Sequence, residues 1–130
     1  MRKSGWAGYI NVLYLATGRR DRVKNAILDA GLVLTAELWL GLTTEEYATL
    51  QIEDGAGGTL AKALTGSYNL ASNEVTVTST AIFTSGEVSF DVTTVALIGS
   101  LGTRIAEATV NIPSGNAVEI TREDLLAEVA

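Results

Sequence analysis

What the chain lacks limits the chemistry it can do: its 130 residues include no histidine and no cysteine. The sequence therefore offers no imidazole base, no thiolate nucleophile and no metal site built from those ligands. Its remaining acid–base groups are carboxylates, and a pair drawn from Glu37, Glu87, Asp91 and Glu107 has the residue types of a glycoside hydrolase. All four are expected on outward strand faces, where a carboxylate is normally solvated. The sequence thus favours a protein that is not an enzyme and uses no cofactor or metal.

Basic residues are concentrated at the start of the chain. Six of the nine lysines and arginines lie within residues 1–24, where Asp21 is the single acid, whereas residues 25–130 hold fourteen acids and three bases. This pattern predicts a basic, aromatic N-terminal arm over residues 1–22, which docks on an acidic protein surface, and a body over residues 23–130. The candidate partner-binding residues are Arg2, Lys3, Trp6, Tyr9, Tyr14, Arg19, Arg20 and Arg22.

Nucleic acid and membrane partners are not expected. The basic residues come without the interleaved aromatic pattern or groove-reading helix of a nucleic-acid-binding surface. The apolar run over residues 6–15 is about half as long as a membrane-spanning helix. A protein is therefore the predicted partner, and the sequence leaves open whether the arm lies on its own body or on a neighbouring subunit.

The elements that must position these residues begin with residues 32–43. Apolar side chains occupy every second position there, which predicts a strand with one buried face that includes Leu38 and Leu40. Before it, apolar residues at helical spacing predict a helix over residues 19–30, ended by Gly31. We expect that helix to cover Trp39 on the outer face of the strand.

The rest of the chain alternates between strand and turn patterns. Residues 43–52 fit one or two helical turns, and the glycine-rich residues 53–58 predict a surface loop. From residue 73 onward strands are expected at 75–84, 88–92, 95–98, 103–112 and 117–121, with turns at 85–86, 99–102 and 113–116. The end of the chain, residues 121–130, fits a short helix or a closing strand, and the early acids favour the helix.

One early helix and six to eight strands at intervals of about ten residues are typical of an antiparallel β domain. The sequence predicts a mainly β fold: an antiparallel β-sandwich or jelly-roll-like domain with one N-terminal helix and the basic arm.

The order of short motifs resembles a class of small bacteriophage structural proteins, often described as tail-fibre or minor virion proteins. The resemblance covers roughly residues 23–121 and rests on five features. These are Asn-Ala-Ile-Leu at 25–28, Leu-Trp-Leu-Gly-Leu-Thr at 38–43, the glycine-rich loop, the run from Asn-Glu-Val-Thr to Ala-Ile-Phe at 73–83, and Val-Ala-Leu-Ile at 95–98 before a glycine hairpin. The arm has no counterpart in that class.

The resemblance implies a non-enzymatic structural protein located in the virion. We expect a capsid decoration (cement) protein that forms homo-oligomers and docks through its arm on a major capsid or tail protein. A tail, collar or fibre component is the first alternative. A carbohydrate- or receptor-binding module is the second, and it would require clustered exposed aromatic side chains.

Overall fold

The computed structural model describes residues 3–71 and 74–129, with side chains for residues 7–70 and 74–125. Within these ranges the chain is mainly β, with one short helix. The elements in order are β1 (Lys3–Tyr14), β2 (Arg20–Ile27), α1 (Asp29–Trp39), β3 (Tyr47–Glu53), β4 (Thr59–Ala63), β5 (Thr65–Ala71), β6 (Glu74–Phe83), β7 (Val92–Gly99), β8 (Arg104–Ile112) and β9 (Val118–Val129).

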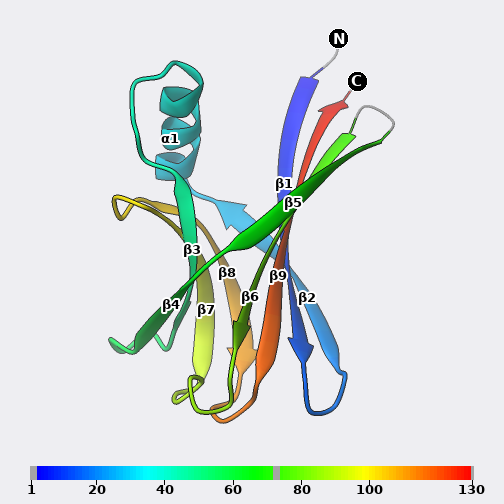
Figure 1. The fold of residues 1–130 in the computed structure, drawn as a ribbon, viewed down its shortest axis with the longest axis vertical. Helices are drawn as coiled ribbons and strands as arrows, with labels where there is room; N and C mark the ends of the chain where they lie inside the picture. Colours follow the sequence, from blue (N-terminus) through cyan, green and yellow to red (C-terminus); the bar gives the residue numbers. More distant parts are fainter. Residues whose placement is uncertain (1–2, 72–73, 130) are drawn as a thin grey trace.

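All nine strands belong to one sheet, in the order β4-β3-β7-β8-β2-β1-β9-β6-β5, and every neighbouring pair is antiparallel. The sheet curls on itself until β4 approaches β6 (Figure 1). Lys62 on β4 closes the remaining gap: its Nζ lies 2.7 Å from Glu87 Oε1 and 5.6 Å from the centre of the Phe83 ring. The coarser prediction, a mainly β antiparallel fold, is confirmed, although the strands form one curled sheet where a sandwich has two.

The core lies inside the curl, where inward-facing side chains from six strands meet. Alternation along each strand sends one face into this core and the other to solvent. The largest apolar side chains buried there are Phe83, Ile10, Leu50, Ile52, Ile112 and Ile120.

The prediction of a strand over residues 32–43 is wrong, because α1 covers most of that segment. Leucine, alanine and glutamate are strong helix formers. Most residues from 32 to 43 are apolar, so apolar residues also fall at every second position without forming a strand. The helix ends at Gly41, which adopts φ +69°. The N–H of Gly41 donates to the carbonyl of Leu38 (3.2 Å) and that of Leu42 to the carbonyl of Glu37 (2.9 Å), the paired bonds of a Schellman cap.

Gly31, expected to stop a helix, instead lies inside α1 where the helix approaches β8. A Cβ at this position would lie 2.2 Å from the carbonyl oxygen of Ile105, so only glycine permits the contact. Leu34 follows one turn later and packs with Leu97 and Ile105 in a second apolar cluster. Leu38 is only half-buried and Leu40 is exposed, so the prediction that both lie inward is wrong.

The helix predicted over residues 19–30 is also wrong, because most of that segment is β2, the second strand of a hairpin. The turn is made by Gly18 at φ +75°, and the N–H of Tyr14 donates to the carbonyl of Arg19 at 2.8 Å. The apolar spacing that suggests a helix is outweighed by the pairing of β2 with β1.

Three smaller predictions are also corrected. Residues 47–53 form β3 where helical turns were expected, and residues 88–91 form no strand. The closing segment continues β9, so the favoured helix over 121–130 is wrong. Arg122 and Asp124 occupy inward positions of β9, which conceals its apolar alternation. The loop at 54–58 and the turns at 100–103 and 113–117 lie close to where the sequence predicts them.

Residues 3–14 and 20–22 of the expected arm lie in strands β1 and β2 of the sheet, and residues 15–19 form the turn between them. β1 pairs with β9 at twelve successive positions, from Lys3↔Val129 to Tyr14↔Val118. The boundary expected after residue 22 falls within β2, so the described part of the arm and the body share strands.

Candidate functional site

The predicted partner-binding residues lie on or near the β1–β2 hairpin. Arg2 lies outside the described residues, and Lys3 and Trp6 lie in the part of β1 where side chains are not described. The structure brings four of the other five together in two small groups, each combining an aromatic ring with arginine, while Arg20 is exposed at the start of β2.

The first group lies on the outer face of the sheet. The guanidinium of Arg22 stacks 4.3 Å from the centre of the Tyr9 ring, and its Nη1 lies 3.2 Å from Glu123 Oε2 on β9. Half of the Arg22 side chain is exposed, so solvent screens this ion pair. The arrangement holds an arginine flat on the surface, where it remains accessible.

The second group surrounds Tyr14, which is buried and points into the curl. Its hydroxyl donates to the carbonyl oxygen of Asn111 on β8 at 3.0 Å. Arg19 lies 5.0 Å from the Tyr14 ring centre and pairs with Asp21 at 3.1 Å. Burial and then the Asp21 carboxylate raise the pKa of the Tyr14 hydroxyl, against an opposing effect of Arg19. Tyr14 is therefore a structural residue, in contrast to its predicted role in binding.

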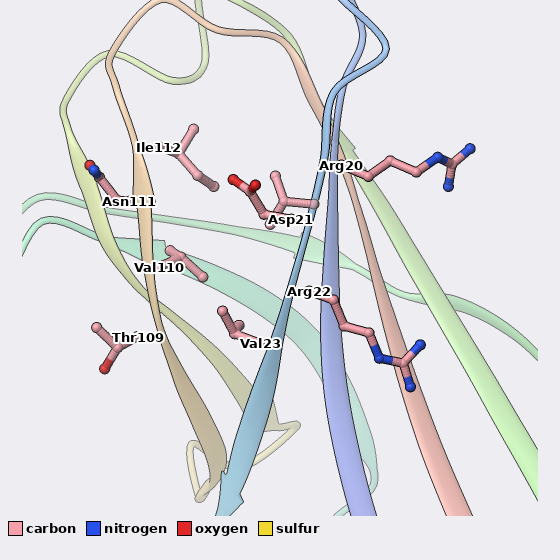
Figure 2. Close-up of a pocket in the computed structure, with 9 residues that line it drawn as sticks. Arg20, Asp21, Arg22, Val23, Thr109, Val110, Asn111 and Ile112 are labelled. Carbon is pink, nitrogen blue, oxygen red and sulfur yellow. The ribbon is translucent and has the colours of Figure 1, made fainter.

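A groove opens beside the hairpin, between β2 and β8. The two strands pair only at Ala26↔Glu107 and Ile27↔Ala106 and then separate toward the turn, leaving a volume of about 510 Å³ between them. Figure 2 shows Val23 and Val110 between the separated strands, while the side chain of Arg22 points away from β8. The sequence gives no signal of this groove, because it depends on strand pairing.

Helix α1 and the residues just after it present apolar side chains to solvent, although the leucines among them were expected to face the core. Trp39 is 83 % exposed, where a covering helix was expected, and its neighbours Leu40 and Leu42 are also largely exposed. Leu32 and Val33 add to this surface at the start of the helix. We call these five residues the α1 apolar surface.

A buried polar cluster lies on the inner face of β9, and sequence reasoning missed it. Arg122, 1 % exposed, donates from Nε and Nη2 to the two carboxylate oxygens of Asp124 at 2.6 and 2.7 Å. Gly8 on β1 leaves room for it, since a Cβ there would lie 3.0 Å from Asp124 Oδ1 and 3.3 Å from Asn25. Within the described part of the chain, Nη1 of Arg122 and both amide atoms of Asn25 are buried without a hydrogen-bond partner. The signal available in the sequence is alternation: Arg122 and Asp124 continue the every-second-residue spacing of the apolar Val118 and Ile120.

The four carboxylates considered for hydrolysis each have a different structural setting. Glu37 lies on α1 and not on a strand. The other three are held by structural contacts: Glu87 by Lys62 at 2.7 Å, Glu107 by Arg104 at 2.7 Å, and Asp91 by the N–H of Ser114 at 2.9 Å.

Two further carboxylates have structural roles that the sequence does not indicate. Glu45 is buried against the β7–β8 turn and accepts hydrogen bonds from the N–H groups of Leu101 (3.0 Å) and Thr103 (2.9 Å). Bonds from the Thr103 side chain and backbone lower the pKa of the Glu45 carboxyl. Glu53 receives two bonds of 2.7 Å from Arg104, which lower the pKa of its carboxyl.

Comparison with protein-family models, with curated proteins and with solved structures finds no match to the chain. Among the side chains described, those of residues 7–70 and 74–125, no group of acidic residues is arranged to hold a metal ion. In the same ranges, the single helix is too short to cross a membrane.

Proposed function

We propose that this chain is a non-enzymatic structural protein of a bacteriophage particle, which acts by binding other protein subunits in several copies. The observation that best supports a binding role is the α1 apolar surface. Trp39, Leu40 and Leu42 place large apolar groups in water at the end of the helix. Covering them in an assembly would recover roughly 25 cal/mol for each Å² of apolar area removed from water.

The state of the charged groups supports a structural role over catalysis. Glu87 and Glu107 each bond to a basic side chain, and the buried Arg122 is neutralised by Asp124. Groups engaged in this way hold strands together and offer no free acid–base pair to a substrate. Proteins that build particles need this kind of rigidity and little else.

The particle itself is inferred from the resemblance to small phage structural proteins. A capsid decoration (cement) role is favoured, because a small curled sheet without a fibrous repeat does not build a shaft. A tail, collar or fibre part is the alternative. In this proposal the curled sheet has the role expected of a sandwich or jelly roll: its two facing halves enclose the core as two separate sheets would.

A second candidate, a carbohydrate- or receptor-binding module, is favoured by one observation. Trp39 and Thr35 lie one turn apart on α1, and the Thr35 hydroxyl contacts the hydroxyl of Tyr47. Trp39 and Tyr47 are both exposed aromatic side chains at this end of the sheet. Exposed rings with a polar edge are a common feature of sugar-binding surfaces. A glycan array that shows no binding by the purified protein would remove this candidate.

The direct test is immunogold labelling of particles with antibody raised against the purified protein. Gold over the heads is the expected result and supports decoration, whereas gold on the tail supports the alternative. Absence of gold from every particle contradicts the proposal.

Incorporation of variants tests the role of α1. Trp39→Gln with Leu40→Gln should lower the copy number per particle by about tenfold or more, because a central apolar contact is lost. Thr76→Gln with Thr78→Gln, on the outer face of β6, is the matched control and should leave the copy number unchanged.

A further inference from the structure

The groove between β2 and β8 has the form of a missing strand. Continuing the register of the two existing pairs places Val23 opposite Val110 and Arg22 opposite Asn111, and these residues line the groove. The strands thus remain aligned after they separate (Figure 2). Two aligned strands that diverge leave a wedge whose walls are both sheet edges.

The backbone polar groups of both walls point into the groove. The bond from Tyr14 N–H to the Arg19 carbonyl fixes which residues of β2 face β1, and by alternation Arg20, Arg22 and Lys24 face β8. On β8, the bond from Leu28 N–H to the Ile105 carbonyl directs odd-numbered residues toward β2 in the same way.

One contact supports this assignment of directions. The carbonyl of Asn111, an odd-numbered residue of β8, accepts its hydrogen bond from the hydroxyl of Tyr14 and not from a strand. A carbonyl has two lone pairs, so Asn111 can accept a second bond. A neighbouring strand could supply that bond and also pair with Arg22.

The charges at the rim indicate which strand would fit. The side chains of Arg20, Arg22 and Lys24 are exposed along β2, while Thr109 and Asn111 on the β8 side are uncharged. Toward the core the groove is lined mainly by valine and isoleucine, with Asp21 as the charged exception. A strand in this position would meet apolar side chains on its inner face and basic side chains on its outer face.

We infer that the β2–β8 groove accepts an extended segment of a partner protein, apolar at its inward positions and acidic at its outward ones. Such a segment adds main-chain hydrogen bonds to both walls, as in other strand-addition complexes. The β5 edge of a second copy is a poorer occupant, because β5 is already paired with β6 on one side. The inference goes beyond the particle proposed above and holds for any partner with such a segment.

The test uses a short synthetic peptide in which valine and glutamate alternate, labelled with a fluorophore and titrated with the intact protein. Binding measured by fluorescence anisotropy should weaken as salt is raised. A peptide with lysine in place of glutamate should not bind, nor should one with a central proline, which removes a ladder N–H.

Protein variants locate the binding. Arg20→Gln with Arg22→Gln should weaken affinity for the valine–glutamate peptide by about tenfold or more. Ala61→Glu with Ala63→Glu changes net charge by the same amount at exposed positions of β4, at the far end of the sheet, and should alter affinity by less than about twofold. Urea midpoints confirm that both double variants fold.

Three results would overturn the inference. They are no binding of the valine–glutamate peptide at about 1 mM, equal binding of the lysine peptide, and equal weakening by the Ala61 and Ala63 control. None of these bears on whether gold labels the particles, so the inference and the proposed function can fail separately.

Discussion

The β1–β2 hairpin is joined to the rest of the sheet on its two sides in opposite ways. On one side β1 pairs with β9 at twelve successive positions, although that seam carries the buried charges of Arg122 and Asp124. On the other side β2 pairs with β8 at only two positions, although Val23 and Val110 could face each other there. We call these the closed seam and the open seam.

The difference shows that apolar content does not decide where a sheet closes. The closed seam tolerates an ion pair because two short bonds join Arg122 to Asp124, although Nη1 of Arg122 has no hydrogen-bond partner among the described residues. In the open seam the Tyr14 hydroxyl occupies the Asn111 carbonyl, which a paired strand would otherwise use. Strand pairing therefore depends on where the backbone hydrogen bonds are made, and a seam left open is available to a partner.

The largest expected effect is at the closed seam. Arg122→Ala removes one partner of a buried ion pair and with it the positive charge beside Asp124, which should lower the free energy of unfolding by about 3–5 kcal/mol. Arg22→Ala removes an exposed arginine that also pairs with a β9 carboxylate and should cost about 0–1 kcal/mol. Urea denaturation of the two variants provides the comparison. Equal losses of unfolding free energy in the two variants would mean that the buried Arg122 contributes no more stability than the exposed Arg22.

A valine on each side of the hairpin gives a matched test of packing. Val12 on β1 is fully buried, whereas Val23 on β2 is half-buried beside the groove. Val12→Ala should cost about 2 kcal/mol through lost burial and a residual cavity, and Val23→Ala about half of that or less. Thermal and urea unfolding measure both, and a larger loss at Val23 would show that the open seam is packed in solution.

A smaller effect is expected from the contact between β4 and β6 that closes the curl. The hydrogen bond from Lys62, helped by the Thr84 N–H, lowers the pKa of Glu87 to about 2. A carboxyl with a lowered pKa stabilises the fold above its unfolded value of 4.5, and this stabilisation is lost as pH falls from there toward about 2. The urea midpoint of the wild type should therefore drop over this interval.

Lys62→Met separates the contribution of this contact from that of other carboxylates. Its urea midpoint should fall less steeply between pH 4.5 and about 2, because the pKa of Glu87 moves back toward its usual value. Glu45 and Glu53 also have lowered pKa values and leave a residual slope in the variant. An identical slope in both proteins would show that Lys62 does not hold Glu87.

The sequence predicts elements best where alternation is apolar and uninterrupted, as in β6 and β8. It fails for the later part of β9, because Arg122 and Asp124 stand at inward positions and pair with each other. It fails for α1 and β2 for a related reason: each has a pattern that fits the other element, and tertiary contacts decide. The contact of Gly31 with Ile105 places the helix, and pairing with β1 makes residues 20–27 a strand.

The candidate site is predictable only in part. The basic residues of the hairpin are visible in the sequence, and Arg20 and Arg22 do lie on an accessible surface. Tyr14 looks like a binding residue in the sequence, but it is buried because it occupies an inward-facing position of β1, as Ile10 and Val12 do. The groove cannot be predicted, since it exists only where two strands distant in sequence fail to pair.

Amide hydrogen exchange of the free protein tests the difference between the seams most directly. The N–H groups of Arg22 and Asn111 face the open seam, and those of Asn11 and Thr121 face the closed one. We expect the first pair to exchange at least about a hundredfold faster, because no strand protects them. Equal and strong protection of all four amides would mean that the sheet closes in solution, and would contradict the account.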